Sequence, residues 1–136
     1  MKICVIDAQG AGIGQTIIKR IRKQLPQIEL IAIGTNKIAM TNMLEAGAIS
    51  GLYGEEAIIK FFEQTCIDAI IGPIGILVAG GIKGEITLGI SQAIFTKSCP
   101  KYIIPLKRHG IFIPGTSDLL IKDMIQDIID QLKNDL

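Results

Sequence analysis

A glycine-rich turn near the amino terminus constrains the fold more than any other feature of the chain. Residues 2–6 form a short apolar run that ends at Asp7, as a buried strand does. Residues 8–14 read AQGAGIG, and apolar residues then recur at the spacing of one helix face: Ile17, Ile18, Ile21 and Leu25. A strand, a glycine turn and a helix in this order are typical of the start of a nucleotide-binding α/β domain.

The spacing of these glycines matches the dinucleotide fingerprint GxGxxG only in part. Gly10 and Gly12 fill its first two places, but Gln15 stands at the third and the glycine comes one residue early, at Gly14. Such a turn lets a phosphate approach the backbone at the helix amino terminus. It predicts a cofactor site with the phosphates at Gly10, Gly12 and Gly14 and a ligand hydroxyl at Asp7, and Gln9 and Ile13 are further candidate ligands. Two alternatives stay open: the glycines only make a tight connection, and Asp7 bonds turn amides instead of a ligand hydroxyl.

The end of the second expected strand, residues 29–33, bears on the choice of cofactor. Domains that bind NAD usually place an acidic residue there for the ribose hydroxyls, whereas this chain continues with Gly34-Thr35-Asn36-Lys37. Thr35 and Asn36 are candidate ribose ligands, and Lys37 can meet a 2′-phosphate. NADP or another nucleotide is therefore as credible as NAD. The alternative is a helix cap followed by an exposed lysine.

A second glycine turn follows the expected fourth strand, residues 67–71. Gly72, Pro73 and Gly75 are predicted to face the first turn across the point where the strand order reverses, because ligands bind there in open α/β sheets. A helix expected over residues 85–97 brings Glu85 near the same crevice. The glycines between residues 72 and 84 can instead serve close backbone packing.

Two residues are weak candidates for catalysis, His109 and Glu85. His109 is the only histidine and follows the fifth expected strand, so it can act as an acid or base or join Lys107 and Arg108 in an anion-binding cluster. A solvated basic loop is the alternative. The Tyr-x-x-x-Lys pair of short-chain dehydrogenases is absent, since Ala57 and Leu106 stand four residues after the two tyrosines.

Strand and helix patterns alternate along the whole chain and predict one domain, residues 1–136, with an α/β fold of three layers. We expect a doubly wound, mostly parallel, Rossmann-like sheet in the strand order 3-2-1-4-5. Further strands are expected at residues 48–52 and 102–106, with a short sixth strand at 111–113. Further helices are expected at residues 36–46 and 55–64, and a last helix begins at its cap, Ser117.

The composition excludes several classes of partner and site. A net charge of +1 gives no reason to expect nucleic acid or a membrane surface. The three cysteines are far apart in the sequence, so neither a disulfide framework nor a metal site is indicated. No segment resembles a signal peptide or membrane span, and a cytoplasmic protein is expected. The 49% content of hydrophobic residues suits a sheet covered on both faces and a homodimer or larger homo-oligomer.

Four segments together resemble a known family: VIDAQGAGIG at residues 5–14, IGTN at 33–36, GPIG at 72–75 and GEIT at 84–87. They are similar to an uncharacterised bacterial family of Rossmann-like domains, the domain of unknown function DUF3842, over nearly the full length. The resemblance implies the fold and transfers no activity. The first strand–helix–strand unit also resembles short-chain dehydrogenases that bind NAD(P), but departs from them in its glycine pattern.

Three functional hypotheses follow from the sequence. The first is a nucleotide-binding protein with the phosphate at the first glycine turn. The second is a regulatory or structural homo-oligomer that binds a small anion or no ligand. The third is a small enzyme whose site is completed across a subunit interface by His109 or Glu85.

Overall fold

Five parallel strands form one sheet in the order β3-β2-β1-β4-β5, as predicted. The computed structural model describes residues 1–108 and 110–136. In the central strand, Val5 pairs with Ala32 on one side and with Ile71 on the other. The strands are β1 (Lys2–Asp7), β2 (Glu29–Gly34), β3 (Ser50–Tyr53), β4 (Ala69–Pro73) and β5 (Lys101–Ile104).

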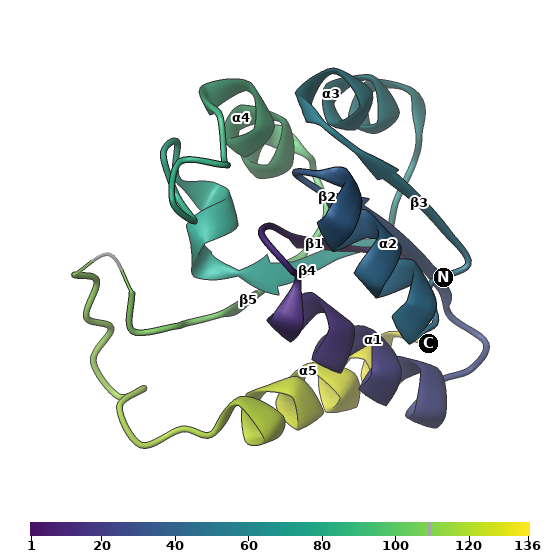
Figure 1. Cartoon of the computed structure of the whole chain (residues 1–136). Coiled ribbons are helices and arrows are strands. Elements are labelled where there is room, and N and C mark those ends of the chain that lie inside the picture. Colours follow the sequence, from purple (N-terminus) through teal and green to yellow (C-terminus); the bar gives the residue numbers. More distant parts are fainter. Residues whose placement is uncertain (109) are drawn as a thin grey trace.

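Helices cover both faces of the sheet and give three layers (Figure 1). On one face lie α1 (Gly12–Gln24), α2 (Lys37–Ala46) and α5 (Ile121–Asp135), and on the other lie α3 (Glu55–Gln64) and α4 (Leu88–Thr96). The alternation of side chains along a strand explains the two cores. In β1, Ile3 and Val5 point toward α1 and α5, whereas Cys4 and Ile6 point toward α3 and α4.

The segment between β4 and α4 is irregular, and α4 begins later than the sequence predicts. A short 3₁₀ helix, η1 (Ile74–Leu77), is followed by turns up to residue 87. The Thr87 hydroxyl accepts a hydrogen bond from the Ile90 amide and caps α4. The predicted helical start at Glu85 is therefore wrong, because the cap is two residues further on. Glu85 stays in the turn and is free to reach toward β1.

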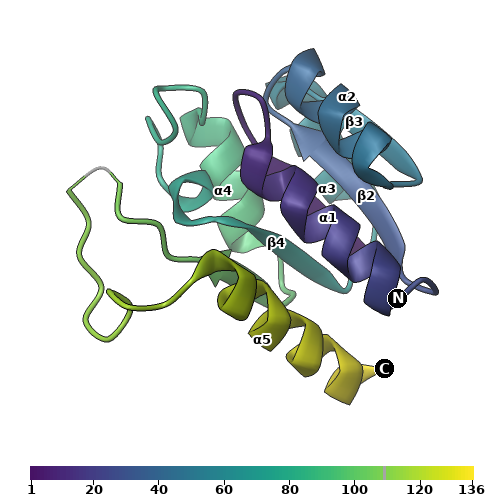
Figure 2. The ribbon, with the colours of Figure 1, turned by 60° about the horizontal axis from the view of Figure 1, so that its bottom comes forward.

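Between β5 and α5, residues 105–108 and 110–120 belong to a long arm that projects from the body of the protein (Figures 1 and 2). Its described residues contain no strand, so the predicted sixth strand at residues 111–113 is wrong. Pro105 and Pro114 lack an amide hydrogen for a ladder, and Gly110 and Gly115 turn the chain through positive φ angles of 68° and 86°. The last helix begins after Leu120, not at Ser117 as predicted.

Candidate functional site

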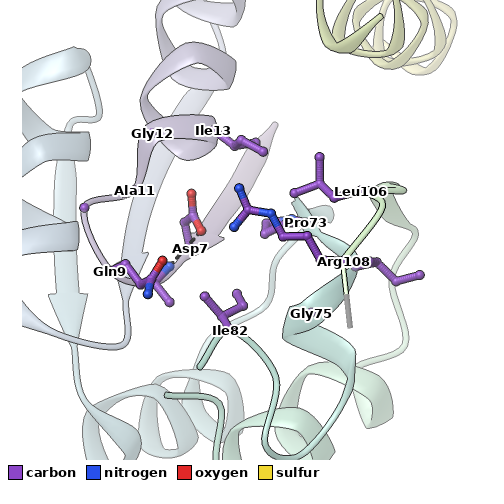
Figure 3. Close-up of a pocket in the computed structure, with 13 residues that line it drawn as sticks. Asp7, Gln9, Ala11, Gly12, Ile13, Pro73, Gly75, Ile82, Leu106 and Arg108 are labelled. Carbon is purple, nitrogen blue, oxygen red and sulfur yellow. Dashed lines mark hydrogen bonds between the residues drawn. The ribbon is translucent and has the colours of Figure 1, made fainter. Parts of the chain in front are cut away.

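A pocket of about 220 Å³ lies between the turn after β1 and the turn after β4 (Figure 3). These strands are neighbours in the sheet, and the connections that follow them leave in opposite directions. Open α/β sheets bind ligands at this point, outside the carboxyl ends of the strands. The lining residues are Asp7, Ala8, Gln9, Gly10, Ala11, Gly12, Ile13, Pro73, Ile74, Gly75, Ile82, Leu106 and Arg108.

The three glycines of the first turn have different structural roles. A Cβ atom at Gly14 would lie 2.6 Å from the Met43 sulfur and 3.1 Å from the Asp7 Cβ, so this glycine lets α1 pack on the sheet. A Cβ atom at Gly10 or Gly12 would meet nothing within 4 Å, and neither residue has a positive φ. The packing of the chain therefore requires glycine at position 14 but not at positions 10 and 12.

The backbone of the turn is held in an unusual conformation. Gln9 and Ala11 have φ angles of 52° and 57°, in the left-handed region that residues other than glycine rarely adopt. Each such residue stores about 1–3 kcal/mol, and it persists only where the surroundings fix it. The Ala11 amide donates to the Ala8 carbonyl at 2.9 Å, which closes the turn.

The first amides of α1 face the pocket. The Gly14 amide donates to the Asp7 carboxylate at 2.8 Å. The amides of Gly12 and Ile13 have no acceptor in the described part of the chain, as expected for the first turn of a helix. Both residues line the pocket, where the helix dipole favours negative charge.

Asp7 forms the floor of the pocket and is only 6% exposed. Its carboxylate accepts hydrogen bonds from the Ala8 and Gly14 amides, each at 2.8 Å. Burial raises the pKa of Asp7, and these two amides and Arg108 offset that effect only in part, so the pKa stays above its ordinary value. In Figure 3 the Arg108 side chain extends across the pocket toward Asp7. The pocket thus has an acidic floor and a basic rim.

The opposite wall is apolar and rests on a second strained turn. Ile82, Lys83 and Gly84 have consecutive positive φ angles of 50°, 53° and 82°, and Ile82 is a β-branched residue for which this is an outlier. A Cβ at Gly75 would lie 2.7 Å from Ile82 Cγ1, so the absence of a side chain there lets Ile82 form the wall. Gly72 does not line the pocket. A Cβ there would lie 2.6 Å from the Ile6 carbonyl oxygen, which makes Gly72 a packing residue.

Glu85 binds the two turns that follow β1 and β2. Its Oε1 atom accepts hydrogen bonds from the Gln9 amide at 3.0 Å, the Thr35 hydroxyl at 2.6 Å and the Asn36 side-chain amide at 2.9 Å. Desolvation raises the pKa of Glu85, but these hydrogen bonds lower it by more. The pKa of Glu85 therefore lies below its ordinary value, and the hydrogen bonds favour the ionised carboxylate.

The predicted ribose ligands are therefore engaged with the protein itself. Asn36 also caps α2, since its Oδ1 accepts from the Ala39 amide at 2.8 Å. Neither Thr35 nor Asn36 lines the pocket. The structure does bring Glu85 close to the first turn, as the sequence suggested, where it accepts hydrogen bonds from the Gln9 backbone amide and from the Thr35 and Asn36 side chains.

His109 lies outside the described residues. The predicted cofactor ligands do not include six of the lining residues: Ala8, Ala11, Ile74, Ile82, Leu106 and Arg108. The basic run at residues 107–109 was a usable signal for Arg108, whereas no local pattern identifies Ile82 or Leu106.

Among the described residues, no group of three or more His, Cys, Asp or Glu side chains could hold a metal ion. Within the same residues, no helix has the length and apolar character needed to cross a membrane.

The model of the family DUF3842, described as a domain of unknown function, matches residues 2–136. The chain belongs to this family. The resemblance inferred from the glycine motifs is thus confirmed. No curated protein sequence matches this DUF3842 chain.

Among solved structures, the chain is similar to a dodecameric FMN-dependent UbiX-like decarboxylase from Escherichia coli O157:H7. The two are 14% identical, and the alignment covers 99% of this chain and 93% of that one with a TM-score of 0.55. At this level of identity the likeness shows a shared α/β fold. It supports the predicted fold class and leaves the ligand to be inferred from the site.

Proposed function

We propose that this DUF3842 protein binds a phosphorylated mononucleotide, with the phosphate at the first glycine turn. The observation that carries the proposal is the open space above Gly10 and Gly12, next to the unpaired amides of Gly12 and Ile13. Glycine at positions 10 and 12 serves no packing or backbone requirement of the chain. An approaching ligand gives it a reason, because backbone amides then contact the phosphate directly.

Arg108 and Asp7 fit the two ends of such a ligand's polar part. The Arg108 guanidinium supplies a positive charge and several donors for phosphate oxygens. The Asp7 carboxylate, on the pocket floor, suits a hydroxyl of the adjoining sugar or polyol. Ile13, Ile82 and Leu106 provide an apolar boundary, which strengthens the electrostatic contacts by excluding water.

The size of the pocket favours a mononucleotide over a dinucleotide as the ligand. Pockets that enclose most of a drug-sized ligand span about 300–1,000 Å³, whereas this one holds about 220 Å³. A phosphate and the adjoining polyol fit this volume. NADP, the other ligand expected from the sequence, needs further groups near Asn36, whose side chain already makes three hydrogen bonds.

FMN is the first ligand to test, because the similar solved structure is FMN-dependent and FMN carries one phosphate on a polyol chain. Bound flavin would supply redox or electron-pair chemistry. The chain's own residues would hold the phosphate through Gly12, Ile13 and Arg108 and orient the polyol through Asp7. An enzymatic role is compatible with this arrangement, but Glu85 is unsuited to act as a base because the hydrogen bonds to its Oε1 atom hold its pKa below the ordinary value.

A homo-oligomer is supported by the projecting arm. Phe112 in the arm is 70% exposed, and Leu119 and Leu120 at the end of the arm are 49% and 56% exposed. Exposed apolar side chains on an extended segment suit contact with a second copy, and the similar decarboxylase is dodecameric. Three free thiols also agree with a reducing cytoplasm. Light scattering tests this part of the proposal, and a strict monomer would contradict it.

Thermal denaturation with FMN, AMP, NADP and inorganic phosphate tests ligand binding. Because a ligand that binds only the folded state raises the melting temperature, FMN or AMP should raise it more than NADP does. The matched control is Arg108→Leu, which should lower the response to the mononucleotides. If no nucleotide changes the melting temperature at millimolar concentration, the proposed function is wrong.

A further inference from the structure

Three donors from two different turns converge on a single oxygen atom of Glu85. The Gln9 amide, the Thr35 hydroxyl and the Asn36 amide group all donate to Oε1, within 3.0 Å. A neutral carbonyl oxygen has two lone pairs for such bonds, whereas an ionised carboxylate supports stronger and more numerous ones. The three donors thus form an anion-accepting site, which the Glu85 carboxylate occupies.

The anion-accepting site lies where dinucleotide-binding domains hold part of their ligand. In dinucleotide-binding domains, the end of the second strand holds the ribose hydroxyls or the 2′-phosphate. Thr35 and Asn36 occupy that place, directly after β2, and Gln9 belongs to the glycine turn after β1. Glu85 reaches it from the other half of the sheet, 50 residues beyond Thr35 in the sequence.

The backbone around Glu85 is built to hold it there. The Gly80 amide donates to the Ile86 carbonyl at 2.7 Å, and the Ile86 amide donates to the Gly81 carbonyl at 3.1 Å. The Glu85 amide itself donates to the Ile82 carbonyl at 3.2 Å. The turn that carries Glu85 also positions Ile82 against the pocket, so the anion-accepting site and the pocket share one supporting turn.

We propose that Glu85 is a specificity-determining residue: its carboxylate occupies the anion-accepting site between the turns after β1 and β2, and thereby limits the ligand to a single nucleotide. The inference rests on the proposed function for the ligand at the glycine turn. The occupation of the anion-accepting site by the Glu85 carboxylate does not depend on the proposed function. Removal of the carboxylate exposes three donors to solvent anions.

The test combines anion rescue with nucleotide titration of Glu85→Ala. Without its acceptor, the variant should melt at a lower temperature than wild type. Formate or acetate should restore part of the loss relative to chloride at equal ionic strength, because a small carboxylate can enter the vacated space. Wild type and Glu56→Ala, which alters an exposed glutamate of α3, should show no such preference. An identical response to all anions in Glu85→Ala contradicts the proposal.

Nucleotide affinities measured by calorimetry complete the test. Glu85→Ala should gain about tenfold in affinity for NADP relative to FMN, the equivalent of one charge-assisted hydrogen bond, and an unchanged ratio contradicts the specificity role. If neither FMN nor NADP binds wild type or Glu85→Ala while formate still restores the stability of the variant, the proposed function is wrong, but the occupation of the anion-accepting site by Glu85 is supported.

Glu85→Gln is the second test variant, for use if Glu85→Ala does not fold. It keeps the volume of the side chain, so it should still reject NADP. The amide proton resonance of Gln9 should nevertheless move upfield, because a neutral oxygen is a weaker acceptor. A variant that binds NADP as tightly as FMN, or whose Gln9 resonance does not move, contradicts the proposal.

Discussion

Replacement of Gly12 by alanine should stabilise the protein and weaken its ligand binding at the same time. The new methyl group meets no atom of the chain within 4 Å, and the φ of Gly12 is not positive. Alanine therefore costs nothing in the folded state and reduces the entropy of the unfolded chain, which is worth about 0.4–1 kcal/mol. The same methyl group projects into the space proposed for the phosphate.

The loss of affinity can be estimated from the cost of an added methyl group in a packed site, about 1–3 kcal/mol. This corresponds to a weakening of roughly 5- to 150-fold. Gly14→Ala is the matched control within the same turn. Its methyl group would lie 2.6 Å from the Met43 sulfur, so it should destabilise the fold by about 1–3 kcal/mol.

Urea denaturation gives the free energies of unfolding, and titration calorimetry with FMN gives the affinities. The expected signs of the stability change are opposite for the two variants. If Gly12→Ala bound FMN as wild type does, the explanation of this glycine by ligand approach would be refuted. If Gly12→Ala were as destabilised as Gly14→Ala, the distinction between open and packed glycines would be refuted as well.

Three further predictions concern Arg108, Asp7 and Phe112. Arg108→Leu removes a charged donor from the rim of the pocket and should weaken FMN binding about 10- to 150-fold, the equivalent of about 1.5–3 kcal/mol. Arg108 is exposed, so the loss of its attraction for the Asp7 carboxylate should lower the urea midpoint only slightly. Arg108→Lys should retain part of the affinity. The pKa of Asp7 is raised in the folded state, so its contribution to stability should fall as the pH rises from its unfolded value of 3.8 through its folded pKa. A ¹³C titration of the Asp7 carboxyl should show this, and added phosphate should raise the pKa further. Phe112→Ser should lower the mass measured by light scattering without changing the FMN affinity of the residual oligomer, and an unchanged mass would exclude the arm from the interface.

The sequence predicts the sheet well because the signals there are local and agree with one another. The apolar runs around Val5, Ile31 and Ile71 are buried strands, and each is followed by a glycine or proline near its end. The alternation of strands with helices indicates a doubly wound sheet, and the glycine turn after the first strand favours the order 3-2-1-4-5 that is typical of dinucleotide-binding domains.

The errors fall where a tertiary contact decides a local choice. Glu85 has a good helical propensity and was assigned to the start of a helix, but its carboxylate satisfies three donors elsewhere, and Thr87 supplies the cap. The apolar residues 111–113 favour a strand, yet the described part of the arm pairs with no strand of the sheet. The roles of Ile82 and Leu106 in the pocket depend on loop paths that no periodicity encodes.

The amides of the glycine turn can be assigned one by one, and this gives a direct test of the site. Buried amides are almost always paired, and five in this region have acceptors. Ala8 and Gly14 donate to Asp7, and Gln9 donates to Glu85. Ala11 and Gln15 donate to the carbonyls of Ala8 and Ala11.

Three amides of the turn have no acceptor in the described residues: those of Gly10, Gly12 and Ile13. All three residues line the pocket. Because Asp7, Glu85 and two backbone carbonyls accept from the remaining amides, these three are the amides of the turn that can donate to a ligand phosphate. Hydrogen exchange measured by NMR should therefore slow at Gly10, Gly12 and Ile13 when FMN is added, with little change at Gln9. Slowing at Gln9 instead would place the anion on the side of the turn that Glu85 occupies.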